Sequence, residues 1–308
     1  MKLAFIINEF AGNGKGRRIW KNIERKLTVP YEAYISHYPK HAFLLARELA
    51  ERAANDKQQV LLIVIGGDGT VHEVVNGCVN CNYIILGNIR AGSGNDFARG
   101  FFAFRNAQEI ASFLHKPNVR KIDIGHIQCP NEHFFVNNCG IGFDAFVGIK
   151  ANKSNIKKWL NKIGMGKLSY VYYVVLGLFM FKPFSLTVQH GGQTLHYDQV
   201  WFATVSNQPY FGGGMKISPH SITADGKLEL TIVHKLSRLK FLTIFMTVFL
   251  GVHTRFSQVA QMSGATFRFQ GDRMLPCHAD GEEINDHGLA LNVNVRPTVI
   301  KIAERLSD

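Results

Sequence analysis

Residues 60–77 read VLLIVIGGDGTVHEVVNG, and the architecture of the first part of the chain can be predicted from them. Val60–Ile65 is a run of apolar, largely β-branched residues, which is typical of a strand buried on both faces, as in a parallel sheet. The next residues, GGDGT, predict a sharp turn, and the valines at 71, 74 and 75 have helical spacing. The stretch therefore predicts a strand, a glycine-rich turn and a helix, in that order.

The chemistry of this turn favours a phosphate ligand. A glycine-rich turn between the carboxyl end of a strand and a helix N-terminus exposes backbone N–H groups that phosphate oxygens can accept from. Asp68 inside the turn is a poor direct partner for phosphate but suits a phosphate-bound Mg²⁺. A tight turn in an ordinary Rossmann-like domain is the alternative interpretation.

The same alternation extends outward through the first 125 residues. Strands and helices are expected in turn at residues 3–7, 17–27, 31–36, 40–54, 83–87, 108–115 and 119–124. Four strand–helix alternations predict an open parallel sheet that binds ligands at the carboxyl ends of its strands. Asp96, in a second glycine-punctuated turn, and Asp123, on the last strand, are expected to lie with Asp68 at one crevice.

After Gly125 the pattern becomes all-β. Strands are expected at 134–138, 186–190, 199–206, 227–234, 266–269 and 290–295, interrupted by apolar segments at 150–181 and 236–252. We therefore predict an α/β N-terminal domain over residues 1–125, with a Rossmann-like parallel sheet, and an all-β C-terminal sandwich domain over residues 126–296. The tail, residues 297–308, is expected to return to the first domain.

Composition narrows the classes of partner. The chain has 308 residues and a formal net charge of +12, which favours anionic partners. The sequence shows no RNP-type motif, zinc-finger spacing or arginine-rich arm, so no nucleic-acid partner is expected. The five cysteines include a Cys78-x-x-Cys81 pair without a second pair to complete a zinc site, so free cytosolic thiols are expected.

The apolar runs define the expected relation to the membrane. Leu168–Phe181 and Phe241–Val252 fall short of the roughly 20 residues that a spanning helix needs. A cytoplasmic protein with peripheral contact to the inner face of the cell membrane is expected. The basic stretch Lys150–Lys167, with Lys153, Lys157, Lys158 and Lys162, precedes an aromatic segment and suits docking on an anionic surface. A core helix with a solvated lysine face is the alternative.

Three motifs together resemble the diacylglycerol kinase catalytic family, which includes bacterial soluble lipid kinases and the sphingosine and ceramide kinases. They are GGDGTVHEVVNG at 66–77, GSGNDFAR at 92–99 and Asp280-Gly-Glu282. The loop from Asn8 to Gly12 and the stretch Ala224–Leu228 also fit, so the resemblance covers nearly the whole chain. GGDGT alone is shared with NAD kinases and is close to the phosphofructokinase turn, which implies a sheet of that kind here.

The resemblance implies ATP and Mg²⁺ as cofactors. The acidic network that organises the catalytic Mg²⁺ matches Asp68, Asp96 and Asp123. The positions implied to contact the nucleotide are Asn8, Glu9, Phe10, Ala11, Gly12, Ser36, Gly66, Gly67, Asp68, Gly69, Thr70, Val71, His72, Glu73, Asn76, Ser93 and Asn95.

The resemblance also implies an acceptor side. The general base is placed in the Asp-Gly-Glu motif, so Asp280 and Glu282 are both candidates. A second, structural Mg²⁺ would bind Asp225 and backbone carbonyls near Ile222 and Lys227. Phe211, residues 212–214 and Met215 are expected to line the acceptor pocket.

Two departures from the family pattern fall in the nucleotide-side loops. Glu9 stands where a proline is usual, and Arg90-Ala91 replaces the usual proline before the GSGND glycine. Glu9 brings negative charge toward the expected phosphates, which puts nucleotide affinity in question.

The expected reaction is transfer of the γ-phosphate of ATP to diacylglycerol, giving phosphatidic acid. Another lipid alcohol (a sphingoid base or a phosphatidylglycerol-like headgroup), an NAD kinase and a non-catalytic, nucleotide-regulated lipid-binding protein are the alternatives. Exposed strand edges in the second domain favour a homodimer.

Overall fold

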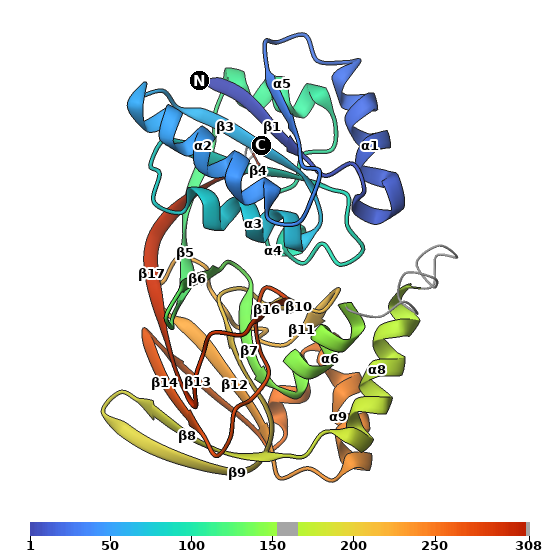
Figure 1. The fold of residues 1–308 in the computed structure, drawn as a ribbon, viewed down its shortest axis with the longest axis vertical. Coiled ribbons are helices and arrows are strands. Elements are labelled where there is room, and N and C mark those ends of the chain that lie inside the picture. Colours follow the sequence, from blue (N-terminus) through green and yellow to red (C-terminus); the bar gives the residue numbers. More distant parts are fainter. Residues whose placement is uncertain (153–165, 306–308) are drawn as a thin grey trace. The chain divides into compact units, whose positions relative to one another are not determined.

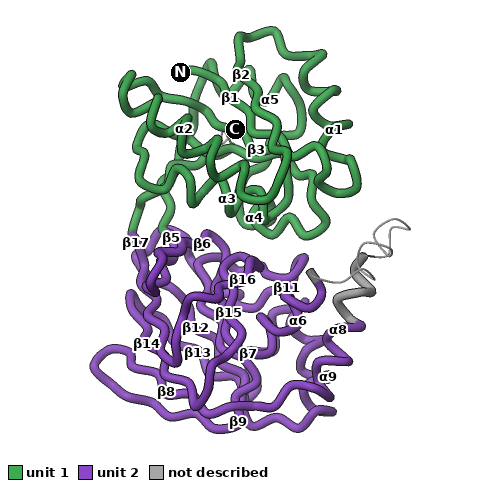
Figure 2. The backbone as a smooth tube through the Cα atoms, viewed as in Figure 1, with its two compact units in different colours: residues 1–123, 297–308 green, residues 124–296 purple. Residues whose placement is uncertain are grey.

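The chain forms two compact units in a computed structural model that describes residues 1–152 and 166–305 (Figures 1 and 2). The first unit comprises residues 1–123 and the segment from 297 onward, and the second comprises residues 124–296. The chain passes from one unit to the other within β5 (Val119–Gln128) and again within β17 (Ala290–Ala303). Each unit has its own sheet and its own apolar core.

The first unit is an α/β domain with a parallel sheet, as the sequence predicts. Its strands lie in the order β2-β1-β3-β4-β17, and each neighbouring pair in this order is parallel. Besides parts of β5 and β17, its elements are β1 (Lys2–Ile7), α1 (Ala11–Glu24), β2 (Glu32–Ile35), α2 (His41–Asn55), β3 (Val60–Gly66), α3 (Asp68–Cys78), β4 (Ile84–Arg90), α4 (Phe97–Gly100) and α5 (Ala107–His115).

Strand β3 is central because every one of its residues is buried. It pairs with β1 on one side and with β4 on the other, so neither edge of its backbone is left open. Its apolar side chains pack with aromatic residues from several elements, among them Phe5, Trp20, Phe104 and Phe113. A continuous apolar strand of this kind is what a sheet covered on both faces requires.

The second unit is built around an antiparallel sheet, with a strand path β16-β15-β7-β9-β8-β14-β17 and with β12 joining β9 to β13. Besides the parts of β5 and β17, its elements are β6 (Glu132–Phe135), β7 (Asn138–Gly142), α6 (Phe143–Asn152), α8 (Gly166–Met180), β8 (Phe184–His190), β9 (Gln193–Ser206), β10 (Tyr210–Phe211), β11 (Met215–Lys216), β12 (Leu228–His234), α9 (Arg238–Thr247), η1 (Val248–Leu250), η2 (His253–Arg255), β13 (Val259–Gly264), β14 (Thr266–Gly271), β15 (Cys277–Ala279) and β16 (Glu282–Ile284).

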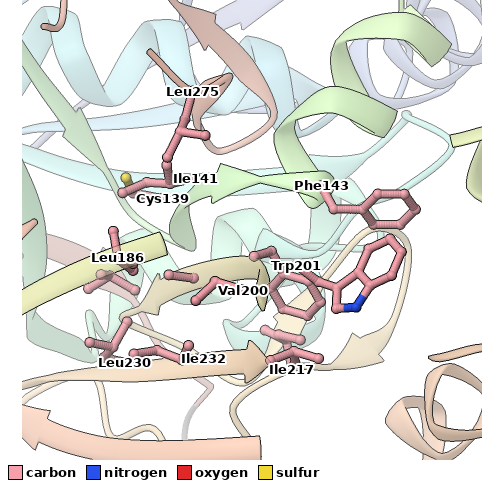
Figure 3. Packing of buried hydrophobic residues seen from close by; sticks show 14 of the residues in the cluster. Cys139, Ile141, Phe143, Leu186, Val200, Trp201, Ile217, Leu230, Ile232 and Leu275 are labelled. Carbon is pink, nitrogen blue, oxygen red and sulfur yellow. The ribbon is translucent and has the colours of Figure 1, made fainter. Parts of the chain in front are cut away.

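The core of the second unit joins the sheet to helices α6, α8 and α9. Figure 3 shows Phe143, the first residue of α6, beside Trp201 of β9, and their ring centroids are 5.6 Å apart at nearly a right angle. Trp201 also donates its indole N–H to the carbonyl of Leu236 at 2.9 Å, just before α9. Buried aromatic side chains of this size dominate the stability of a core.

Two expectations about strands in the second unit need correction. The strand expected at Phe134–Asn138 is interrupted, because the backbone N–H groups of Val136 and Asn137 donate to the carboxylate of Asp280 instead of to a neighbouring strand. Strand β13 was not expected, since Val259–Gly264 carries polar residues and lacks a long apolar alternation. It forms because it pairs with β12 in an antiparallel arrangement over six residue pairs.

The end of β17 completes the first unit. Lys301 and Ile302 pair in parallel with Ile85 and Leu86 of β4. Earlier in this segment, the N–H of Thr298 donates to the fully buried carboxylate of Asp123 at 2.6 Å.

None of the helices in the described ranges combines the length and the apolar character needed to cross a membrane. Lys153, Lys157, Lys158 and Lys162, which were expected to dock on a membrane, lie outside the described residues.

Candidate functional site

Three loops of the first unit meet at the carboxyl end of its sheet. The amide of Asn8, after β1, donates to the hydroxyl of Thr70 in the GGDGT turn at 3.0 Å. A Cβ atom at Gly12 would lie 2.2 Å from the carbonyl oxygen of Ala91, and one at Gly92 would lie 2.5 Å from the Cα of Gly67. Glycine is required at these contacts because the loops touch through their backbones.

The first of these loops explains where α1 becomes regular. Gly12, Asn13 and Gly14 lie at the start of α1 but have left-handed backbone angles, with φ of 56°, 56° and 82°. A left-handed run is costly for residues with a Cβ atom, and the two glycines reduce that cost. The regular helix therefore follows this loop, as the sequence indicates.

Asp68 and Asp96 face the same point near Gly94. A Cβ atom at Gly94 would lie 2.6 Å from Oδ2 of Asp68 and 3.9 Å from Oδ2 of Asp96. The other oxygen of Asp68 accepts the backbone N–H of Phe97 at 3.0 Å, and Oδ1 of Asp96 pairs with Arg99 at 3.0 Å. An oxygen of each carboxylate thus lies near this point, and two carboxylates close together are an arrangement suited to a hydrated Mg²⁺.

Other predicted nucleotide-side residues have structural contacts. Both oxygens of Glu73 accept backbone N–H groups at the start of α2, from Lys40 at 2.8 Å and Ala42 at 3.1 Å. Glu73 therefore caps α2, and both of its oxygens are engaged in that contact. The side chain of Val71 is buried in the core, so only its backbone is available to a ligand.

The remaining predicted positions lie on or beside the same loops. The amide of Asn76 donates to the carbonyl of His72 within α3, and Asn95 exchanges two hydrogen bonds with Gly92. Ser93 and Phe10 are exposed, whereas Ser36 is buried at the end of β2.

The two departures from the family pattern have local partners. Glu9 forms an ion pair with Arg17 at 3.4 Å, which offsets the negative charge that it brings to this loop. Arg90 donates to the carbonyl oxygen of Ala98 and so ties the end of β4 to α4. Glu9 is therefore not left as an isolated charge beside the glycine loops.

In the second unit, Asp280 and Glu282 differ sharply in environment. The carboxylate of Asp280 is buried and accepts three backbone N–H groups, from Val136, Asn137 and Asn138, at 2.8–3.1 Å. These bonds hold both oxygens of the carboxylate in place. Glu282 is exposed on the short strand β16.

An apolar cavity that is partly open to solvent also lies in the second unit. Phe211 and Met215, which the sequence analysis assigned to the acceptor pocket, are among its lining residues. Helices α8 and α9 contribute apolar side chains, including Val174, Phe241, Ile244 and Phe245. The cavity thus combines a largely apolar wall with only a few polar groups, which is typical of a small-molecule site.

The polar groups of the cavity wall include Asp144, near the start of α6, and Thr204 of β9. Gly140 of β7 pairs with Thr204 of β9 on one side and with His278 of β15 on the other. Asp144 accepts the Thr204 hydroxyl at 2.7 Å and lies 3.5 Å from Nε2 of His278. A Cβ atom at position 140 would be 2.0 Å from the Asp144 carboxylate, so the glycine makes room for this group.

His253 forms another polar part of the cavity wall. It is fully buried, and its Nε2 donates to the carbonyl of Ile217 at 3.0 Å. Burial lowers the pKa of His253, and the bond to the carbonyl only partly opposes this. The ring is therefore kept neutral in a mostly apolar cavity.

Sequence reasoning missed Asp144, Thr204 and His278. The available signal was a carboxylate inside the apolar run GIGFDAFVG at 140–148.

The expected structural metal site is less defined: Oδ1 of Asp225 accepts the N–H of Lys227 at 3.0 Å, and Ile222 is exposed.

Comparison with known proteins matches both units. A family model described as the diacylglycerol kinase catalytic domain matches residues 2–127, and one described as the YegS C-terminal NAD kinase beta sandwich-like domain matches residues 137–304. YtlR of Bacillus subtilis (strain 168), provisionally named a lipid kinase, is 33% identical over 96% of this chain and 98% of its own length. A diacylglycerol kinase of Mycobacterium tuberculosis (strain CDC 1551 / Oshkosh) is 29% identical over 75% of this chain and 72% of its own length.

Solved structures show the same fold. A protein from Bacillus anthracis str. Sterne, provisionally named a diacylglycerol kinase, has a TM-score of 0.75 and 20% identity, and the match covers 99% of this chain and 95% of that one. An NAD kinase from Archaeoglobus fulgidus, solved in complex with ATP, has a TM-score of 0.50 and 10% identity over 98% of this chain and 93% of that one. The chain belongs to the diacylglycerol/lipid kinase family, with a YegS-type C-terminal domain.

Proposed function

We propose that this protein transfers the γ-phosphate of ATP to the hydroxyl of diacylglycerol and so forms phosphatidic acid. The observation that carries the choice of a lipid acceptor is the apolar cavity of the second unit with its polar Asp144–Thr204 group. Membership of the family supports the kinase activity, and the cavity supports an acceptor with acyl chains and a small polar end.

On the donor side, the three glycine loops would hold the phosphates of ATP through their backbone N–H groups. Asp68 and Asp96 fit a Mg²⁺ because an oxygen of each carboxylate lies near one point beside Gly94. When bound, the ion offsets charge on the β- and γ-phosphates during transfer. Asp123 stays a predicted member of this network, and its carboxylate also holds Thr298.

On the acceptor side, we propose Glu282 as the general base. A lipid hydroxyl is a weak nucleophile, and a carboxylate within reach can accept its proton as the new bond to phosphorus forms. Asp280 is poorly suited to that step because three backbone N–H groups already hold it. We assign to Asp280 the role of positioning the turn that carries Glu282.

The reaction is tested by incubating the purified protein with ATP labelled at the γ-phosphate and with diacylglycerol in mixed micelles. Labelled phosphatidic acid is the expected product. A sphingoid base is the second candidate, because the carboxylate of Asp144 in the cavity could pair with its ammonium group, so the panel includes it. Label in that lipid alone would overturn the acceptor and keep the kinase, while label only in NAD⁺ would contradict a lipid kinase.

Filling the cavity should weaken the lipid acceptor selectively. Val174→Phe adds volume to a buried cavity-lining position, so we expect the KM for diacylglycerol to rise about tenfold or more, while the KM for ATP stays within about twofold. The control is Val175→Phe on the adjacent, 41% exposed position of α8. Equal kinetics for the two variants would show that the cavity does not take the lipid.

Helix α9 suggests how the protein reaches its acceptor. Its inner side chains, such as Phe241 and Ile244, line the cavity, whereas Leu239 and Met246 are 79% and 65% exposed. Leu250, just beyond the helix in η1, is 75% exposed. Lys240, next to Leu239 in the sequence, is also exposed. Exposed apolar residues next to basic ones favour the surface of an anionic bilayer.

Binding to vesicles tests this surface. With Leu239→Asp and Leu250→Asp combined, we expect sedimentation with vesicles rich in phosphatidylglycerol to fall several-fold, because two apolar contacts are lost and two negative charges are added. Met274→Asp is the matched control, since Met274 is also exposed, at 62%, but lies in the loop before β15. Unchanged sedimentation of the double variant would contradict docking through α9.

A further inference from the structure

Three side chains of types that can bind transition metals lie close together in the second unit, and none of them is a residue assigned to the reaction. Cys129 lies in the turn between β5 and β6, and His133 lies on β6. Asp286 comes from the loop that follows β16. One potential ligand atom from each of the three lies within 4.8 Å of the others.

The distances within this cluster suit a single tetrahedral ion. Oδ1 of Asp286 lies 2.9 Å from Nε2 of His133 and 3.7 Å from Sγ of Cys129. With typical zinc bond lengths of about 2.3 Å to sulfur and about 2.0 Å to nitrogen or oxygen, neighbouring ligand atoms stand about 3.3–3.6 Å apart. Small side-chain adjustments would therefore bring the three atoms to bonding distance of one ion.

Asn131 already orients the carboxylate for such a role. Its backbone N–H and its side-chain amide both donate to Oδ2 of Asp286, at 3.0 and 2.8 Å. Oδ1 is thereby directed toward Cys129 and His133. A hydrogen-bonded second oxygen is the usual support of a carboxylate that ligates a metal through one atom.

We propose that Cys129 Sγ, His133 Nε2 and Asp286 Oδ1 bind one Zn²⁺, with the fourth position left to water. On binding, the Cys129 thiol, which in the metal-free state donates to the carbonyl of Asn131, releases its proton to solvent and becomes a thiolate ligand. The chemistry of the donor set, one sulfur, one imidazole and one carboxylate, favours zinc over Mg²⁺.

The position of this site gives the ion a structural consequence. It would join the β5–β6 hairpin to the segment that leaves β16, and β16 carries Glu282. The residues directly after β6 hold Asp280 through their N–H groups. A bound ion would therefore hold the hairpin before the Asp280 contacts and the segment after β16 in place, on either side of the turn that carries Glu282.

Metal binding to the full chain tests the proposal without any kinase assay. The metal-free protein is titrated with Zn²⁺ against a chromophoric chelator in excess Mg²⁺, which does not compete for a thiolate. We expect one Zn²⁺ per chain, with the affinity reduced at least 100-fold by Cys129→Ser and about 10- to 100-fold by Asp286→Asn. Cys81→Ser is the matched control, since Cys81 is also a half-buried thiol that donates to a backbone carbonyl.

Substitution of Co²⁺ for Zn²⁺ identifies the ligands directly. The wild type and Cys81→Ser should show a thiolate-to-cobalt charge-transfer band and visible bands of tetrahedral intensity, and Cys129→Ser should lack the charge-transfer band. No Zn²⁺ binding by the wild type, or binding that Cys129→Ser leaves unchanged, would overturn the proposal and leave the three residues as a hydrogen-bonded cluster. Neither outcome depends on the lipid kinase activity.

Discussion

Replacing Glu282 by Gln should lower kcat for lipid phosphorylation by about 10²- to 10⁴-fold, the usual contribution of a general base. Thermal unfolding should be unchanged, because Glu282 is exposed and glutamine has nearly the same shape. Steady-state kinetics together with a thermal melt measure both quantities. Glu283→Gln is the control, since Glu283 is exposed on the same strand and side chains alternate along a strand.

Asp280→Asn should instead have its main effect on stability. Its amide NH₂ would face backbone N–H donors that now meet a carboxylate, so we expect a loss of about 2–4 kcal/mol in the free energy of unfolding. Chemical denaturation measures this loss. If Asp280→Asn unfolds like the wild type but has no activity, and Glu282→Gln stays active, then Asp280 is the base and our assignment is wrong.

The second large effect is expected from Asp68→Asn. Asparagine keeps an oxygen for the N–H of Phe97 but removes the negative charge, so the α4 contact is retained while Mg²⁺ is held less well. We expect activity to fall about 10²- to 10³-fold and the Mg²⁺ concentration needed for half-maximal rate to rise. Activity measured over a range of Mg²⁺ concentrations gives both values.

Two further variants make the result for Asp68 specific. Gly94→Ala should reduce activity in the same way, because its Cβ atom would lie 2.6 Å from Oδ2 of Asp68. Asp56→Asn removes a charge from an exposed loop and should have no effect. An unchanged Mg²⁺ dependence in Asp68→Asn would exclude Asp68 from the metal site.

The local sequence was sufficient to predict the parallel-sheet architecture of the first unit. The six-residue apolar run at 60–65, the glycine turn and the valine spacing each act over a few residues, and together they define a strand–turn–helix element. The convergence of the loops follows from that element, because the carboxyl ends of parallel strands lie at one edge of a sheet.

The second unit depends on contacts that are distant in sequence. The row of His278, Gly140 and Thr204 arises from the register of three antiparallel strands, and local residue preferences do not fix that register. The break in the expected strand at 134–138 depends on Asp280, more than 140 residues later. The expected homodimer stays a prediction.

The return of the chain's last segment has a consequence for synthesis on the ribosome. Strand β4 gains its second neighbouring strand only after Lys301 and Ile302 have been translated. The hydrogen bond from the N–H of Thr298 to Asp123 also forms only at this late stage. The nascent first unit must therefore persist with an open sheet edge while the whole second unit emerges. We infer that a ribosome that stalls before residue 298 releases a product that is a natural target for chaperones and proteases.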